Sequence, residues 1–155
     1  MKNGFTIVEL LVTIVIVSIL ATAAIPMAEL AIRRSKEQEL RRGLLQIREA
    51  LDAYKQASDQ GHIPVKSGSA GFPPSLDVLV EGVDDAKKPG GGRMFFLRRI
   101  PRDPFAAQGA LPAAATWGKR SYASTAQDPK EGNDVYDVYS MAVGPGLNGI
   151  LYSEW

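Results

Sequence analysis

The feature that most constrains this chain is an uncharged apolar run near its N-terminus. Leu10 to Ala28 are nineteen consecutive residues without a formal charge, whereas the residues after Ile32 are rich in charge. A helix rises about 1.5 Å per residue, so about 20 apolar residues can cross the hydrocarbon core of a bilayer. We therefore expect a helix over residues 5–32 that is surrounded by lipid or by other apolar helices.

Two residues are unusual in this apolar stretch. Glu9 places a carboxylate just inside its start, and Pro26 lies near its end. An ionisable group in a membrane span is costly and is a functional candidate by default. The alternative for Glu9 is that its side chain only reaches back to the headgroups. Pro26 removes one helical hydrogen bond and is expected to bend the helix.

After Ile32 the pattern becomes amphipathic. Apolar residues follow one another at spacings of four, three, four and three, which predicts one buried helix face: Leu40, Leu44, Ile47, Leu51 and Tyr54. Charged residues occupy the other positions: Arg33, Arg34, Glu37, Arg41, Arg42, Arg48, Glu49 and Lys55. We expect the helix to run to about Ser58, with Gly61 as a left-handed cap.

The rest of the chain predicts a small head with one core. Ser75–Glu81 is expected to form a short helix with Ser75 as its N-cap. Strands are predicted at Met94–Ile100, Arg120–Ser124 and Val135–Val143. The expected fold is α+β: a long N-terminal helix, membrane-spanning in its first half and amphipathic in its second, packed on a small antiparallel β-sheet.

Composition excludes several classes of protein. The chain has no cysteine and one histidine, His62, so disulfides, thiolate zinc sites, cysteine nucleophiles and histidine-based triads are not expected. The carboxylate pairs Asp84–Asp85 and Asp134–Asp137 lack the partner spacing typical of general acid–base catalysis. We therefore expect no enzymatic activity.

Basic residues form short clusters, but acidic residues lie between most of them. Residues 33–155 carry 17 Lys and Arg against 15 Asp and Glu. DNA binding by these clusters is an alternative, but a solvated surface or charge pairing between neighbouring copies is favoured, and nucleic acid is not an expected partner. The clusters are Arg41–Arg42, Lys87–Lys88, and Arg98–Arg99 with Arg102.

The first ten residues carry a resemblance to a known family. Gly4-Phe5-Thr6-Ile7-Val8-Glu9-Leu10, behind Met1-Lys2-Asn3, resembles the class III signal of type IV pilin-like proteins. The resemblance implies that residues 1–4 are a leader removed after Gly4 by a prepilin peptidase, and that the new N-terminal Phe5 is N-methylated. It also implies an assembly role for Glu9 and a helix kink at Pro26.

Later segments extend the resemblance. Leu97–Phe105, Val135–Ser140 and Tyr152–Trp155 are similar to segments of the G-type (major) pseudopilins of type II secretion systems. The resemblance implies a transmembrane or filament-core helix over 5–32 and a periplasmic α+β pilin-like head over 33–155.

The implied function is that of a structural subunit of a pseudopilus, a pilus-like fibre that polymerises to drive protein export. The implied location is the bacterial inner membrane, crossed once. The implied partners are further copies of the chain in a helical homopolymer, the peptidase, other pseudopilins, the inner-membrane assembly platform and membrane lipid. A type IV pilus pilin, major or minor, acting in adhesion, motility or DNA uptake stays open as the alternative.

The chain departs from the family in its C-terminal loop. Major pseudopilins of this type usually bind calcium in an acidic loop, but Gly144–Leu151 contains no Asp or Glu. Glu154, even with the Asn148 amide, would make a weak calcium site, so no metal or other cofactor is expected. The Ala-rich loop at 106–116 is also longer and more apolar than the usual turn.

Two other interpretations of the N-terminus stay open. A secretory signal cut near Ala21–Ala24 would discard the first half of one continuous helix. An independent single-span membrane protein would keep an uncut N-terminus. Lys2 precedes the span and Arg33, Arg34 and Lys36 follow it, so charge alone would place the C-terminal side in the cytoplasm, opposite to what the resemblance implies.

Overall fold

The computed structural model describes residues 5–65, 68–88, 90–107, 109 and 111–155. Helix α1 (Ile7–Asp59) contains Pro26 within its span. The chain divides into two compact units, residues 1–36 and residues 37–155, and α1 contributes to both. The predicted α+β class, with one long N-terminal helix and small antiparallel sheets, is confirmed.

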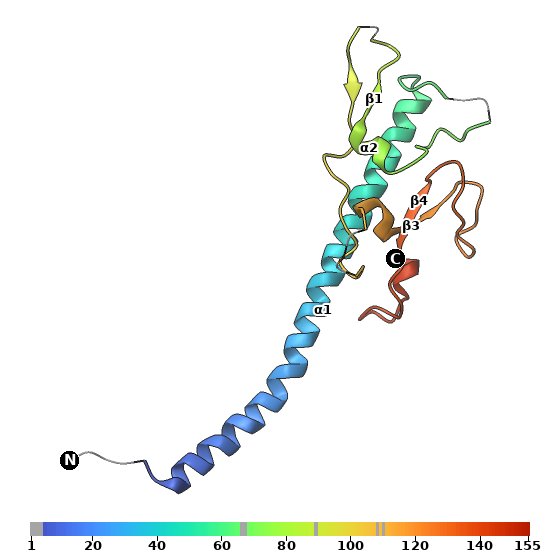
Figure 1. The fold of residues 1–155 in the computed structure, drawn as a ribbon. Helices are drawn as coiled ribbons and strands as arrows, with labels where there is room; N and C mark the ends of the chain where they lie inside the picture. The colour runs from blue at the N-terminus through green and yellow to red at the C-terminus, as the bar shows by residue number, and fades with distance from the viewer. Residues whose placement is uncertain (1–4, 66–67, 89, 108, 110) are drawn as a thin grey trace. The chain divides into compact units, whose positions relative to one another are not determined.

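The second unit is built around residues 37–59 of α1. The elements that follow α1 in the sequence are arranged around this part of the helix (Figure 1). The predicted apolar stripe is confirmed, because all five of its members are buried in one core. The rest of the core comes from the loops, α2 and the strands: Ala50, Ala57, Ile63, Leu76, Leu79, Leu97, Trp117, Val135, Val138 and Tyr152.

The end of α1 is also as predicted. Gly61 has a φ of 77°, the left-handed conformation that glycine adopts without steric cost. The N–H of Gly61 donates to the carbonyl of Ser58, and the N–H of His62 donates to the carbonyl of Ala57. These two hydrogen bonds form a Schellman motif, which pairs carbonyls that the helix end would otherwise leave free.

The next elements correct two predictions. Helix α2 (Asp77–Glu81) is present, but its N-cap is Leu76, without a side-chain hydrogen bond, so the prediction of Ser75 as the cap was wrong. The strand predicted at Met94–Ile100 is reduced to β2 (Arg93–Met94), which pairs antiparallel with β1 (Val83–Asp84). After Met94 the amides of Phe96 and Leu97 both donate to the Leu79 carbonyl of α2, so this backbone is bonded to a helix instead of a strand.

A second antiparallel pair contributes Trp117 and Val138 to the core. Strand β3 (Trp117–Arg120) follows the 3-10 helix η1 (Ala113–Thr116) and pairs with β4 (Asp137–Ser140). Both strands are shorter than predicted, and β3 begins three residues before the predicted Arg120. Gly118 lies opposite Tyr139, whose ring would be 2.3 Å from a Cβ at that position. The glycine therefore lets the tyrosine ring lie across β3.

A buried carboxylate joins the loop before η1 to β4. Asp103 accepts hydrogen bonds from the Ser140 hydroxyl at 2.5 Å and from the Phe105 amide at 2.8 Å. The Asp103 amide donates to the Thr116 hydroxyl at 3.1 Å. The chain ends with the 3-10 helix η2 (Tyr152–Glu154). Asp103 therefore serves as a junction within the core.

Candidate functional site

The first described residues form a capped helix start. The hydroxyl oxygen of Thr6, just before α1, accepts a hydrogen bond from the Glu9 amide at 3.2 Å. This is the usual bond of a Thr N-cap to the third helical residue. Glu9 lies in the first turn, where a carboxylate interacts favourably with the helix dipole. The Thr6–Glu9 spacing thus has a local structural use as well as any role in assembly.

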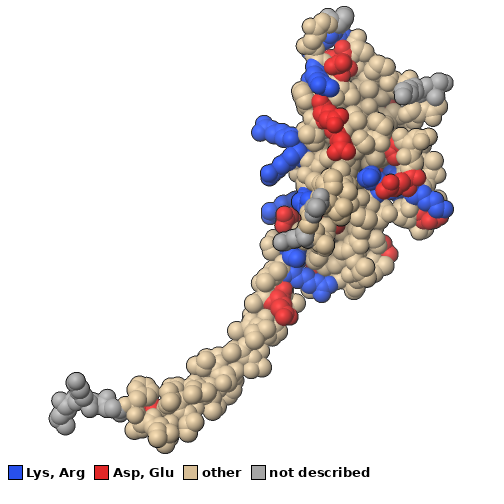
Figure 2. Space-filling view, viewed as in Figure 1, with Lys and Arg blue, Asp and Glu red and all other residues tan. Residues whose placement is uncertain are grey.

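The apolar part of α1 has its large side chains exposed. Phe5 is 73% exposed, and the large apolar residues from Ile7 to Ile32 are exposed as well. Its most apolar 18-residue window has a mean hydropathy of 2.5 and is long enough to cross a membrane. Figure 2 shows this stretch as almost uniformly uncharged on the visible face. Within the described residues, no other segment buries these large side chains.

The polar side chains of this stretch are nearly all satisfied within the helix. The hydroxyls of Thr13, Ser18 and Thr22 donate to carbonyls three or four residues earlier, at 2.7–2.8 Å. Glu9 differs, because its carboxylate has no hydrogen bond or ion pair with any other residue of the described ranges. The Glu9 carboxylate, in the first turn of this apolar surface, is therefore available to an external partner, and the exposed Glu29 follows near the end of the stretch.

The other predicted residues of this region have different outcomes. Gly4, at the predicted cleavage position, lies outside the described residues. Phe5 lies next to it and is exposed. Pro26 is flanked on both sides by helix, and the kink expected there stays a prediction. The boundaries predicted at residues 4 and 32 stay predictions too.

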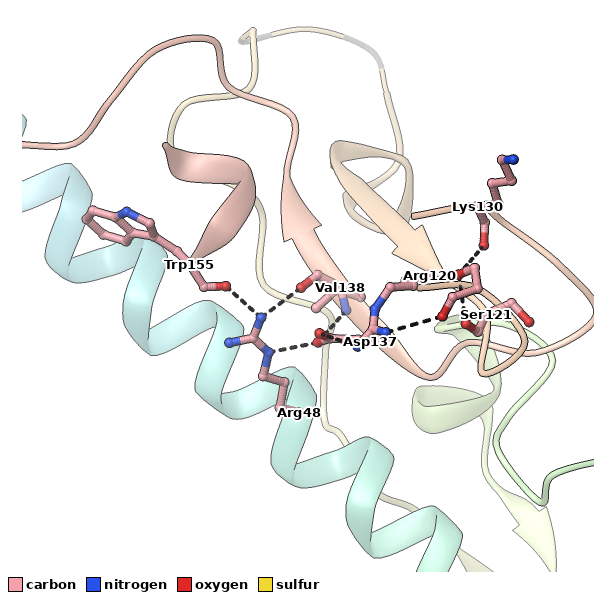
Figure 3. Close-up of polar contacts among 8 residues, drawn as sticks. Arg48, Arg120, Ser121, Lys130, Asp137, Val138 and Trp155 are labelled. Atoms are coloured by element: carbon pink, nitrogen blue, oxygen red, sulfur yellow. Dashed lines mark hydrogen bonds and ion pairs between the residues drawn. The ribbon is translucent and has the colours of Figure 1, made fainter. Parts of the chain in front are cut away.

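In the second unit, Arg48 connects α1 with β4 and the end of the chain (Figure 3). Its Nε donates to Asp137 at 2.8 Å, and its Nη2 donates to the main-chain oxygens of Val138 at 3.2 Å and Trp155 at 2.6 Å. Arg120 contacts the other carboxylate oxygen of Asp137 at 3.3 Å. Arg48 was expected at a charged position outside the apolar stripe. Its spacing from Leu44 and Leu51 was the signal that could have placed it on the packed face.

Glu37 is the second residue that sequence reasoning misplaced. Its side chain is buried, and its Oε1 accepts hydrogen bonds from the Leu147 amide and the Tyr152 hydroxyl, both at 2.8 Å. Glu37 precedes Leu40 by three residues, so it continues the helical spacing of the buried stripe. This continuation of the stripe was the missed signal. The residue fixes the C-terminal loop to the start of the second unit.

The carboxylates considered for catalysis have structural partners. Asp134 accepts hydrogen bonds from the Ser121 hydroxyl and the Tyr122 amide. Asp85 accepts from the His62 ring at Nδ1 and from the Lys87 amide, and these bonds hold the pKa of the Asp85 carboxyl below its ordinary value of 3.8. The His62–Asp85 pair fastens the end of α1 to the β1–β2 hairpin.

The C-terminal loop has no acidic ligand set. Within the described ranges no group of three or more His, Cys, Asp or Glu side chains is arranged to hold a metal ion. The Asn148 amide oxygen, considered as a ligand, accepts a hydrogen bond from the Ile150 amide. The expectation that the chain needs no metal stays a prediction.

Comparison with known proteins first defines the class of the N-terminal segment. A family described as "Prokaryotic N-terminal methylation motif" matches residues 1–25. That span contains Gly4, Phe5 and Glu9, the residues on which the predicted processing and assembly depend. The resemblance to type IV pilin-like proteins is therefore confirmed.

Two relatives extend the likeness over most of the chain. Type II secretion system core protein G of Aeromonas hydrophila is 28% identical over 137 residues, covering 86% of this chain and 88% of the relative. The protein of the same name from Klebsiella michiganensis is 25% identical, covering 86% and 89%. No solved structure matches the chain. The chain resembles the G-type pseudopilins, and the relatives' names describe components of a secretion system.

Proposed function

We propose that this chain is a structural subunit of a pseudopilus of a type II secretion system. It is inserted in the inner membrane through residues 5–32, with its head in the periplasm. It is cut after Gly4, methylated at Phe5 and polymerised to drive protein export. The observation that carries this proposal is Glu9, a carboxylate without a partner in the described chain, which directly precedes nineteen uncharged residues of an exposed helix.

The proposed role of Glu9 is to receive the N-terminal amine of another copy. Removal of residues 1–4 creates an amine at Phe5, with an ordinary pKa of about 7.7–8.0. Methylation keeps this amine cationic. Phe5 and Glu9 are about 6 Å apart along a helix axis, so a neighbouring copy shifted along the fibre brings its amine to this carboxylate. In an apolar surrounding, each charge offsets the cost of burying the other.

The test of this role compares three variants at Glu9 and Glu29. Breaking a buried ion pair costs about 3–5 kcal/mol, which is roughly a hundredfold to several-thousandfold in the association constant. Glu9→Leu should therefore abolish fibres and export while the cut monomer persists in the membrane. Glu9→Gln should be intermediate, because its amide still accepts a hydrogen bond. Glu29→Leu, an exposed acid further along the same helix, is the matched control and should assemble normally.

Each variant is expressed with the assembly machinery, and fibres, exported cargo and cleavage are measured separately. Normal fibres and export from Glu9→Leu would refute the pairing role. The carboxylate would then only reach the headgroups, which was the alternative left open by its position near the start of the span.

Processing is tested independently of assembly. Glycine before the cut bond presents no Cβ to a peptidase that works at the membrane surface, so Gly4→Val should accumulate uncut in the inner membrane. Intact mass of the purified wild-type protein should show loss of residues 1–4 and a methyl group on Phe5. A full-length mass in cells that contain the peptidase would contradict the proposal and favour an independent single-span protein.

The second candidate function is a type IV pilus pilin. The names of the two relatives favour secretion, and the methylation motif fits both functions. Genes beside the coding gene distinguish them: a secretin, a secretion ATPase and other pseudopilins indicate type II secretion, whereas a retraction ATPase indicates pili. The proposed partners are the prepilin peptidase, other pseudopilins and the assembly platform.

A further inference from the structure

The C-terminal segment 141–151 exposes apolar side chains that have no function so far. Its sequence, MAVGPGLNGIL, contains no charged residue. Val143 is 99% exposed, and four further large apolar side chains are 40–55% exposed: Met141, Leu147, Ile150 and Leu151. Large apolar side chains exposed together on a soluble domain mark an interaction site when they form one patch. We call residues 141–151 the apolar loop.

The apolar loop has a defined backbone. Pro145 and Leu151 form an isolated β-bridge. The Gly146 amide donates to the Ile150 carbonyl at 2.8 Å, and the Tyr152 amide donates to the Gly144 carbonyl at 3.3 Å. A surface that is already ordered loses little conformational entropy when it binds. The side chains of the apolar loop are therefore preorganised for binding.

The loop is tied to a particular point on α1. The Leu147 amide donates to Glu37, and so does the hydroxyl of Tyr152, directly after the loop. Glu37 is only five residues beyond Ile32, the end of the proposed membrane helix. Five residues span about 7.5 Å as a helix and at most about 18 Å when fully extended. The covalent chain therefore limits the distance between Ile32 and Glu37, whatever the arrangement of the two units.

The helical distance of about 7.5 Å is comparable with the thickness of the lipid headgroup layer. The headgroup layer adds about 5–8 Å to each side of the hydrocarbon core, and interfacial segments bury apolar side chains at this boundary. The residues between the span and the loop add positive charge, since Arg33, Arg34 and Lys36 precede Glu37. Where the membrane leaflet contains anionic lipid, basic residues next to a span are attracted to its headgroups.

We propose that the apolar loop binds the lipid interface of the membrane that holds residues 5–32 in the monomer, before assembly. This inference rests on the proposed function, because it needs the N-terminal helix to be inserted. Lipid is favoured over other binding partners because residues 33–37 link the apolar loop covalently to the inserted helix, which gives the loop a high effective concentration at the membrane.

The test uses the absence of cysteine in the chain, which allows a single labelled position. Val143→Cys places an environment-sensitive fluorophore on the loop, in the full-length chain reconstituted into phosphatidylcholine and phosphatidylglycerol vesicles. Phe95→Cys is the matched control, because Phe95 is apolar and 63% exposed. The ring of the adjacent Phe96 packs 5.3 Å from that of Tyr54, and Tyr54 is about 26 Å beyond Glu37 along the helix.

Brominated lipids that quench near the headgroups are the readout. We expect the label at position 143 to be quenched at least about twofold more than the label at position 95, as for a group held in the interface. Adding Leu147→Ser and Ile150→Ser should reduce this difference, because the loop loses apolar area. Equal quenching at positions 143 and 95 would overturn the inference.

A third label separates this inference from the proposed function. A fluorophore at Ile16→Cys, within the proposed span, should be quenched by lipids brominated deep in the acyl chains. If position 16 is quenched and position 143 is not, the loop inference fails and membrane anchoring stands. If position 16 is not quenched, both fail. If the label at position 143 becomes less quenched by lipid as the protein-to-lipid ratio rises, a second copy of the chain covers the apolar loop, and the inference is overturned.

Discussion

Replacing Glu37 should lower the stability of the second unit more than replacing an exposed charged residue of the same helix. Glu37→Leu removes the acceptor for the Tyr152 hydroxyl and for the Leu147 amide. A hydrogen bond to a charged group contributes about 1.5–3 kcal/mol, and an unpaired buried donor costs about 1–3 kcal/mol. Tyr152 is buried, so the full loss applies to its hydroxyl, while burial of the leucine side chain returns about 1.5–3 kcal/mol of transfer free energy.

The expected loss in the free energy of unfolding is therefore about 1.5–3 kcal/mol, or roughly 10 °C in Tm for a unit of this size. The assay is thermal unfolding of the detergent-solubilised chain, followed by the fluorescence of the buried Trp117. Glu37→Gln keeps an acceptor and should lose about 1 kcal/mol. Glu39→Leu, exposed two residues further on, should change stability by less than about 0.5 kcal/mol. Equal Tm values for Glu37→Leu and Glu39→Leu would refute this reasoning.

Three further predictions concern the second unit. Leu44→Ala should cost about 2–5 kcal/mol in urea unfolding, whereas its exposed neighbour Leu45→Ala should cost less than 1 kcal/mol; similar losses would contradict the single buried stripe. A chain that begins at Glu29 should be soluble and unfold cooperatively, as measured by near-UV circular dichroism. A chain that begins at Asp59 lacks the helix on which the core packs and should not unfold cooperatively. Cooperative melting of the shorter chain would show that the core does not need α1. The pKa of Asp85 is lowered in the folded protein, so the stabilising contribution of its carboxylate is present above pH 3.8 and is lost as the pH falls through the folded pKa. Asp85→Asn should therefore flatten the acid side of the stability–pH curve. An acid side that does not change would exclude the His62–Asp85 contact as the cause of the acid destabilisation.

The helical parts of the fold were accessible from sequence because their periodicity repeats. Leu40 to Tyr54 follow one spacing for four turns, and Gly61 is a residue that suits the left-handed cap. The strands were less accessible, because β1 and β2 are two residues each. Their positions depend on long-range bonds, such as those of Phe96 and Leu97 to Leu79. No local pattern encodes such partners.

The candidate site shows the same division. Gly4, Phe5 and Glu9 could be proposed from sequence because the motif is contiguous. Glu37 and Arg48 could not be proposed from sequence, because a hydrophobicity pattern does not distinguish a buried, hydrogen-bonded charge from a solvated one. Their partners lie about a hundred residues away in the sequence. Only the position of each charge relative to the apolar stripe carried information about its burial.

The way in which the end of the chain is fastened to α1 has a mechanical consequence. Glu37 holds Leu147 and Tyr152, and Arg48 holds Asp137, Val138 and Trp155. A pull along residues 37–59 of the helix would load these bonds side by side. Bonds that share a load in parallel must rupture together, whereas bonds loaded in series open one after another. We infer that tension on the helix shears the C-terminal part of the unit as a block and does not peel it away from Trp155 inward.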